Sequence, residues 1–295
     1  MPHLLPYGRF SRSLLLMAVA LLGMGQNGWG QWGHVAGKVL LDGEIPVLPP
    51  KVEPGSSSAK LCGQNEIPDY TFKVDPKTHG ISDVFILIRQ RPAKIHPDLE
   101  PIPRRPQKSP PKPTEKEPTQ AALAERTLAE TEKSDEPQGL VVNVKGCQFF
   151  PYTMIVRIGQ PVRITSSDVV LHHIRPFYIL NYGWGAMLAG PEDYSDVPQS
   201  SLKKPEPLPT LVTCDVYSHM ESWWYVSDHP YHAITDAQGG FRIDNLPVGE
   251  HTLTIWHSRT GYIIKSLTVK IQNDTTTTLE PIKVPVARFD KKPKS

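Results

Sequence analysis

The chain has 295 residues, a formal net charge of +2 and 31 prolines. This length allows one large domain or two small ones. The small net charge argues against a nucleic-acid-binding protein, which would need a concentrated basic face. After the first thirty residues, no stretch is apolar enough to cross a membrane.

The N-terminal residues have the features of a secretory signal. Two arginines precede an apolar run from Leu14 to Met24, and a stretch of small residues follows. Such a run is too short to span a bilayer but suits a signal peptide. We expect residues 1–30 to be that signal, with cleavage near Gly28 or Gly30, and an uncleaved signal anchor is the alternative. The mature chain is then periplasmic or extracellular, without stable membrane insertion.

The next segment, up to residue 91, has the pattern of strands and turns. An apolar strand is predicted at Val35–Leu41 before the turn residues Asp42 and Gly43. The continuous apolar run Val84–Ile88 predicts a buried strand.

Residues 92–137 differ in composition from the strand-like segment before them. They hold ten prolines and many lysines and glutamates, which leaves little apolar surface to bury. We expect a disordered insert with at most a short helix at Thr119–Glu132.

After this insert the β pattern returns and continues almost to the end of the chain. Residues 176–210 are rich in loops, and residues 285–295, with three lysines, are predicted to be a disordered tail. Short strands separated by turns, with little helix, predict an all-β sandwich fold. The remaining predicted strands are Leu140–Val144, Thr153–Ile158, Val162–Thr165, Thr210–Thr213, Ala233–Thr235, Phe241–Ile243, Thr252–Trp256 and Ile263–Ile271.

One short loop carries the donor atoms that copper prefers. Cys214, His219 and Met220 offer a thiol, an imidazole and a thioether within seven residues, and His172 follows an earlier strand-like run. Such a set is typical of a blue-copper site, in which two imidazoles and a thiolate lie in one plane and a thioether is the weak axial ligand. Copper is therefore the predicted cofactor.

The chain contains three cysteines, which in an oxidising compartment indicates one disulfide and one free thiol. We favour a bridge between Cys62 and Cys147 because it leaves Cys214 for the metal. A bridge between Cys147 and Cys214 is the alternative, and it would abolish the copper site.

Several motifs together resemble a family of secreted bacterial cupredoxin-like proteins, some described as methylamine-utilisation-like and common in planctomycetes. They are Gly146-Cys147-Gln148-Phe149-Phe150-Pro151, Gly159-Gln160, the run from Asp168 to His172, Cys214-Asp215-Val216-x-x-x-Met220 and Asp228-His229-Pro230-Tyr231. The resemblance covers about Gly33 to Ile271 apart from the proline-rich insert. It implies a cupredoxin-like domain at residues 138–228, with metal ligands at His172, Cys214 and Met220.

The ligand loop departs from that family at one position. The family usually has Cys-x-x-His-x-x-Met, and Tyr217 stands where the histidine is expected. Either His219 replaces it, at the Cys-x4-His spacing of azurin-like loops, or the fold persists without a blue-copper site. His173 stands where an asparagine is common, and a surface position is the simpler explanation for it.

A second signature runs from Thr235 to Leu253, with glycine turns between strands anchored by Phe241 and Leu246. It resembles the carboxypeptidase regulatory-like, transthyretin-like sandwich of the immunoglobulin type, a module without chemistry of its own. The opening Gly37-Lys38-Val39 fits the same family. We expect residues 33–91 and 229–284 to form one discontinuous sandwich, with two consecutive β-domains or one continuous sandwich as alternatives.

Further histidines and aromatic residues lie in this second half. His229 and His257 have two interpretations: a second metal site in which they face one another, or, more plainly, hydrogen-bonded histidines at a domain junction. Trp223, Trp224, Tyr225 and Trp256 are interpreted as junction core.

Two functions compete. The first is an exported copper-binding or electron-transfer protein with a redox partner protein, and the second is a non-metal binding or structural module of the cell envelope. The sequence contains no Ser-His-Asp order, phosphate-binding loop or paired-carboxylate motif that would indicate an enzyme.

Overall fold

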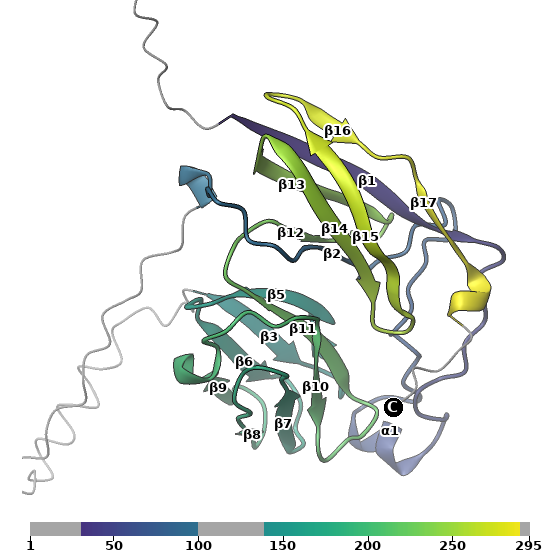
Figure 1. Ribbon diagram of the computed structural model, residues 1–295. Helices are drawn as coiled ribbons and strands as arrows, with labels where there is room; N and C mark the ends of the chain where they lie inside the picture. The colour runs from purple at the N-terminus through teal and green to yellow at the C-terminus, as the bar shows by residue number, and fades with distance from the viewer. Residues whose placement is uncertain (1–30, 100–138, 290–295) are drawn as a thin grey trace, which may run out of the picture.

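The computed structural model describes residues 31–99 and 139–289, and it is built from two packed β-sandwiches (Figure 1). The signal peptide at 1–30, most of the proline-rich insert with its predicted helix, and the chain beyond residue 289 lie outside the described residues. No helix in the described part is long and apolar enough to cross a membrane.

The first sandwich, here called the split sandwich, is built from both ends of the described chain. One sheet has the order β13-β1-β16, with β17 also paired to β1, and the other has the order β12-β2-β14-β15. The strands are β1 (Trp32–Asp42), β2 (Phe85–Ile88), β12 (His232–Ile234), β13 (Gly240–Pro247), β14 (Gly249–His257), β15 (Gly261–Ile271), β16 (Thr276–Thr278) and β17 (Ile282–Pro285).

The second sandwich, here called the inserted sandwich, lies in the chain between β2 and β12, which are themselves antiparallel neighbours. Its sheets have the orders β4-β3-β6-β9 and β5-β11-β10-β7-β8. The strands are β3 (Leu140–Val144), β4 (Phe149–Phe150), β5 (Thr153–Arg157), β6 (Val162–Ser166), β7 (His172–Phe177), β8 (Ala186–Leu188), β9 (Tyr194–Asp196), β10 (Thr210–Cys214) and β11 (Glu221–Ser227).

Strand β2 shows why a continuous apolar run is needed where the two sandwiches meet. All four of its residues are buried, and successive side chains of a strand point to opposite faces. Ile86 and Ile88 pack into the core of the split sandwich. Phe85 and Leu87 pack on the other side, in a cluster with Tyr225 of the inserted sandwich. This strand therefore belongs to two cores.

The aromatic residues predicted at the junction divide between two places. Tyr225 and Trp256 are buried in the junction cluster, and Trp223 packs against it with its ring centroid 5.0 Å from that of Trp256. Trp224 points the other way and is fully buried in the core of the inserted sandwich. Neighbouring residues on β11 alternate between faces, which separates Trp224 from the other three.

Some predicted loops contain short regular elements. The loop-rich region 176–210 includes β8, β9 and the 3-10 turn η2 (Gln199–Ser201). A five-residue helix, α1 (Ser57–Leu61), lies in the segment between β1 and β2, and the Ser56 side chain caps it by accepting from the Ala59 N–H. These elements are too short to produce a recognisable periodicity.

Two segments predicted to be disordered are packed where the structure describes them. Residues 92–99 include η1 (Pro97–Leu99), with Ile95 and Leu99 against the core of the split sandwich. At the other end, η3 (Val286–Arg288) follows β17, and the buried Phe289 stacks on Phe72 with ring centroids 4.2 Å apart. Residues 92–99 and 285–289 are therefore packed rather than disordered, because each segment contributes apolar side chains to a core.

Candidate metal centre

The centre lies at one end of the inserted sandwich, where two neighbouring strands place their terminal residues side by side. His172 begins β7 and Cys214 ends β10, and the antiparallel register pairs Cys214 with Ile174. A short turn from Asp215 to Met220 then leads into β11. Sheet register thus brings together two residues that are 42 positions apart in the sequence.

His172 and Cys214 face each other in the interior. The Nδ1 atom of His172 lies 3.8 Å from the Cys214 Sγ atom, and the two residues are 0% and 2% exposed. A metal ion in a trigonal plane, with bonds of about 2.0 Å to nitrogen and about 2.3 Å to sulfur, would hold these atoms about 3.7 Å apart. The observed separation fits such an ion.

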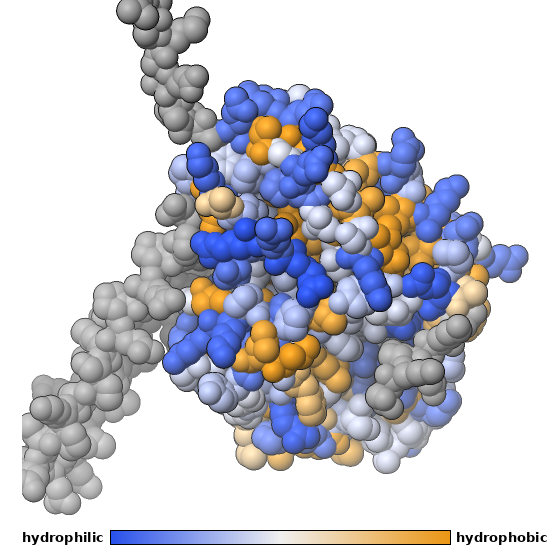
Figure 2. Space-filling model, in the orientation of Figure 1, coloured by the Kyte–Doolittle hydropathy of each residue, from blue (hydrophilic) through white to orange (hydrophobic). Residues whose placement is uncertain are grey.

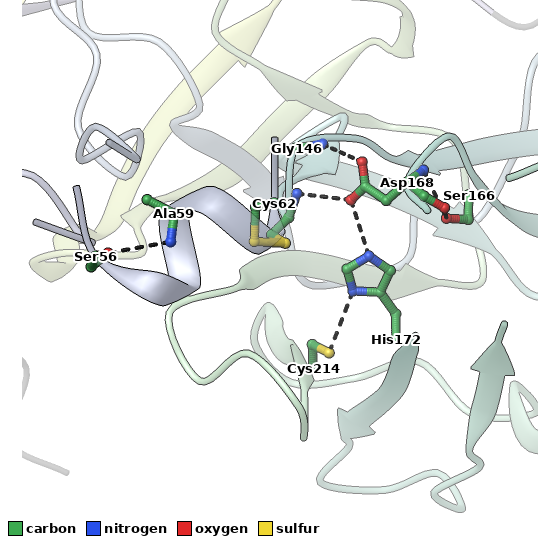
Figure 3. Close-up of a disulfide and its surroundings, with 9 residues drawn as sticks. Ser56, Ala59, Cys62, Gly146, Ser166, Asp168, His172 and Cys214 are labelled. Atoms are coloured by element: carbon green, nitrogen blue, oxygen red, sulfur yellow. Dashed lines mark hydrogen bonds and ion pairs between the residues drawn. A yellow bond between two sulfur atoms is a disulfide. The ribbon is translucent and has the colours of Figure 1, made fainter. Parts of the chain in front are cut away.

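The other ring nitrogen of His172 contacts a carboxylate. Its Nε2 atom lies 3.0 Å from Asp168 Oδ2, and the backbone N–H groups of Gly146 and Cys147 donate to the same carboxylate at 2.6 and 2.8 Å (Figure 3). The carboxylate acts as an acceptor for all three, so Nε2 carries the proton and Nδ1 is the atom that faces the sulfur.

These contacts shift the ionisation of both groups. Burial alone would lower the pKa of His172, but hydrogen bonds to Asp168 and Cys214 outweigh it and raise the pKa to about 9. For Cys214, burial acts to raise the pKa, yet contact with His172 and nearby backbone N–H groups lowers it below its usual value. The environment therefore favours a thiolate, which is the form that binds metals.

The disulfide joins Cys62 to Cys147, with Cα atoms 5.4 Å apart, and leaves Cys214 as a buried free thiol. The alternative bridge between Cys147 and Cys214 is therefore absent. Ligand atoms of Cys147, Asp168 and His172 lie within 4.8 Å of one another, but the Cys147 sulfur is bonded to Cys62 and offers no thiolate. That second cluster is not a metal site while the disulfide is intact.

The remaining predicted ligands are placed less favourably. Met220 is fully buried in the same core as Cys214. His219 is half-buried with its Nε2 atom buried and unpaired, and the structure does not gather His172, Cys214 and His219 within 4.8 Å of one another. The Tyr217 ring, half-buried, lies 5.3 Å from that of His172. His173 pairs with Asp215 at 2.9 Å, on the outside of the sheet.

His229 and His257 lie in separate clusters. The ring of His229 stacks on that of His232 with centroids 4.3 Å apart, close to the end of β11. His257 packs instead between Phe72 and Phe289. Burial lowers the pKa of each histidine to about 4. These environments suit neutral core histidines.

Searches against known proteins agree only at the level of fold. No protein-family model and no curated protein sequence matches this chain. Among solved structures, a copper-containing nitrite reductase from Thermus scotoductus SA-01 is 18% identical over 32% of this chain and 24% of that chain, with a TM-score of 0.27. An oxidised amicyanin variant is 14% identical over 32% of this chain and 87% of its own, also with a TM-score of 0.27.

Each likeness covers about a third of this chain and is a distant structural similarity to cupredoxins. These matches do not assign a type to the split sandwich.

Asp168 is the residue of this candidate centre whose role was not predicted from the sequence. It lies four positions before His172 in the run that carries the family resemblance, but a solvated carboxylate would have the same spacing. Its contacts with Gly146 and Cys147 come from a loop more than twenty residues away.

Proposed function

We propose that this protein is an exported, cupredoxin-like copper-binding protein that transfers electrons and has an altered ligand set. The observation that carries the proposal is the buried pair of His172 Nδ1 and Cys214 Sγ, 3.8 Å apart. A free, thiolate-forming cysteine that faces the Nδ1 atom of an imidazole is a soft donor pair that suits copper.

Two of the four expected ligands fit directly. His172 and Cys214 would hold the ion, and Met220 lies in the same core as a candidate thioether ligand. His219 could complete the set only if the loop moved, since it is not gathered with the other two. Bound copper would supply an electron carrier through exchange between its cuprous and cupric states.

A non-catalytic role is part of the proposal, together with a redox partner protein. Cys214, His172 and Asp168 also contact one another in the arrangement used in nucleophilic catalysis, in which a thiol faces a base and a carboxylate orients the base. However, the thiol and the imidazole are buried, which denies access to a substrate. On the face drawn in Figure 2, apolar side chains form several separate patches among polar ones, and none singles out a docking site for the partner.

Export and family membership extend this proposal. The Cys62–Cys147 disulfide suits an oxidising compartment such as the periplasm or the extracellular space. We propose that residues 138–228 belong to the secreted methylamine-utilisation-like cupredoxins. The split sandwich would be a carboxypeptidase regulatory-like module into which they are inserted.

A second function is favoured by one observation. Tyr217 occupies the position of the missing histidine and packs against the core that contains Cys214. A phenol is a poor ligand for reduced copper, so this arrangement also suits a fold that has lost its metal. The protein would then be a non-metal binding or structural module of the cell envelope.

A Cu(II) titration of the purified protein, followed by visible absorption and electron paramagnetic resonance, tests the proposal. We expect one equivalent of copper and an intense thiolate-to-copper band. Cys214→Ser should abolish the band, whereas His173→Ala, which changes a neighbouring imidazole outside the site, should leave it unchanged. Absence of stoichiometric binding and of the band in the wild-type protein would reject copper binding and support the envelope module.

A further inference from the structure

We infer that Asp168 is the positioning residue of this centre: it fixes the proton of His172 on Nε2 and so reserves Nδ1 for a metal ion beside Cys214. The inference rests on the proposed function, because it assigns a role at the same site. It identifies a residue that is not itself one of the four expected ligands.

The first support is the direct contact. Asp168 Oδ2 lies 3.0 Å from His172 Nε2, and the imidazole is completely buried, so no water competes for this nitrogen. A metal-binding imidazole generally donates its other N–H to a carboxylate or carbonyl, which sets the ring orientation and the tautomer. Here the opposite nitrogen, Nδ1, faces Cys214.

The second support is how firmly the carboxylate itself is held. Gly146 and Cys147 both have left-handed backbone conformations, with φ of 58° and 52°. Successive N–H groups in such a turn converge to form an anion-binding concavity. Both N–H groups donate to Asp168, one to each oxygen, at 2.6 and 2.8 Å. The carboxylate is therefore fixed before any metal arrives.

The third support is the anchor of that turn. Cys147 is bonded through the disulfide to Cys62, which directly follows helix α1 in the segment between β1 and β2. Figure 3 shows the resulting sequence of contacts, from the disulfide through Asp168 and His172 to Cys214. The left-handed conformation of Cys147 is unusual for a residue with a side chain. Two interactions hold it: the disulfide to Cys62 and the hydrogen bond from its N–H to Asp168.

The test compares Asp168→Ala with wild-type protein by 15N-edited NMR of the histidine side chains without metal. We expect wild-type His172 to show a slowly exchanging proton on Nε2, and we expect Asp168→Ala to lose it. Asp196→Ala is the matched control, because Asp196 is a carboxylate on β9 that pairs with Arg163 at 2.7 Å and does not face His172. It should leave the His172 signal unchanged.

Copper binding gives a second readout. If the wild-type protein binds copper, Asp168→Ala should weaken the affinity by about 10- to 100-fold, the usual cost of removing such a hydrogen-bond partner, and should alter the thiolate band. Asp196→Ala should change the affinity less than twofold. If the wild-type protein binds no copper, the proposed function fails, whereas the metal-free NMR comparison still decides the role of Asp168.

Three results would overturn the inference. They are an unprotonated Nε2 in wild-type protein, a rapidly exchanging proton there, or an unchanged proton signal in a folded Asp168→Ala variant. The last result would mean that the carboxylate only fills the turn at Gly146 and Cys147. If Asp168→Ala does not fold, Asp168→Asn serves instead, because an amide cannot accept all three hydrogen bonds and must shift or remove the Nε2 signal.

Discussion

Tyr217 is the side chain at which this centre departs from the ligand pattern expected of its loop. It stands at the third position after Cys214, where the related loops carry a histidine, and its ring lies 5.3 Å from that of His172. The phenol places a hard oxygen donor beside a thiolate and an imidazole. It is therefore the residue to exchange first.

Replacing Tyr217 by histidine should create the missing imidazole. We expect Tyr217→His to raise the Cu(II) affinity at least about tenfold and to give a stronger thiolate band, because a trigonal set of two imidazoles and a thiolate suits copper in both oxidation states. Tyr217→Phe keeps the ring, removes the oxygen and should show no gain. A Tyr217→His protein with unchanged affinity would mean that the loop cannot direct a side chain at this position toward the ion.

His257 is one of the buried histidines that should make stability depend on pH. It is fully buried, its Nδ1 accepts from the Arg259 N–H, and its Nε2 has no partner. Burial lowers its pKa to about 4, below the usual value of 6.5. The unfolded chain therefore binds a proton at a higher pH than the folded protein does. Its contribution is complete above pH 6.5 and is lost as the pH falls toward 4.

Urea unfolding at pH 6.5 and pH 5 measures this effect. One such histidine should cost about 2 kcal/mol of unfolding free energy over that interval. His257→Asn removes the titrating ring but keeps an acceptor for Arg259, so its loss over the same interval should be smaller. An identical loss in both proteins would assign the pH dependence to other groups.

At the scale of elements, β2 has an unusual position because each of its faces belongs to a different core. Ile86 packs within the split sandwich and Leu87 packs toward the inserted sandwich. Most strands of an antiparallel sheet have one solvated face. The unbroken apolar sequence of this strand follows from the packing of one sandwich on the other.

Truncation on either face of β2 should therefore be equally costly. We expect Ile86→Ala and Leu87→Ala each to lower the free energy of unfolding by about 2–5 kcal/mol, the usual range for a buried aliphatic side chain. Val47→Ala, at a residue that is 99% exposed, should change it by less than about 0.5 kcal/mol. A small effect of Leu87→Ala alone, measured by urea unfolding, would show that the two sandwiches are not packed together in solution.

At the scale of the whole molecule, the segment between β1 and β2 ties the two sandwiches together. Its disulfide closes a loop of 85 residues between Cys62 and Cys147. The Tyr70 hydroxyl from the same segment donates to the His219 carbonyl at 3.1 Å. This segment, which includes α1 (Figure 1), thus packs against the end of the inserted sandwich that holds the centre.

Removing this disulfide should loosen both the fold and the centre. For a loop of this length, the chain-entropy model gives a loss of about 4.6 kcal/mol for the variant that combines Cys62→Ala with Cys147→Ala. Urea unfolding measures the loss, and Cys214→Ala, which removes a thiol but no cross-link, is the control. A loss below about 1 kcal/mol would show that other contacts already hold the segment in place.

The sequence by itself determined several local elements of this protein and the donor atoms offered by one loop. Alternation and unbroken apolar runs identify β1, β2, β14 and β15, because side-chain burial in a strand has a short period that the sequence displays directly. Strand β11 was not predicted, because its aromatic residues, Trp223 to Tyr225, face two different cores and show no simple alternation. The donor atoms of the loop from Cys214 to Met220 can likewise be read directly from its residue types.

Only the tertiary structure decided which distant residues meet. Three cysteines allow more than one bridge, and the choice of Cys62 with Cys147 depends on a segment of the split sandwich folding over the inserted one. The contact of Asp168 with His172, and the failure of His219 to join Cys214, depend on loop conformations set by that packing. Phe289 likewise is buried because its ring stacks on Phe72, a residue more than two hundred positions earlier in the chain. Such contacts depend on sheet register and chain reversal, which no local pattern of residues specifies.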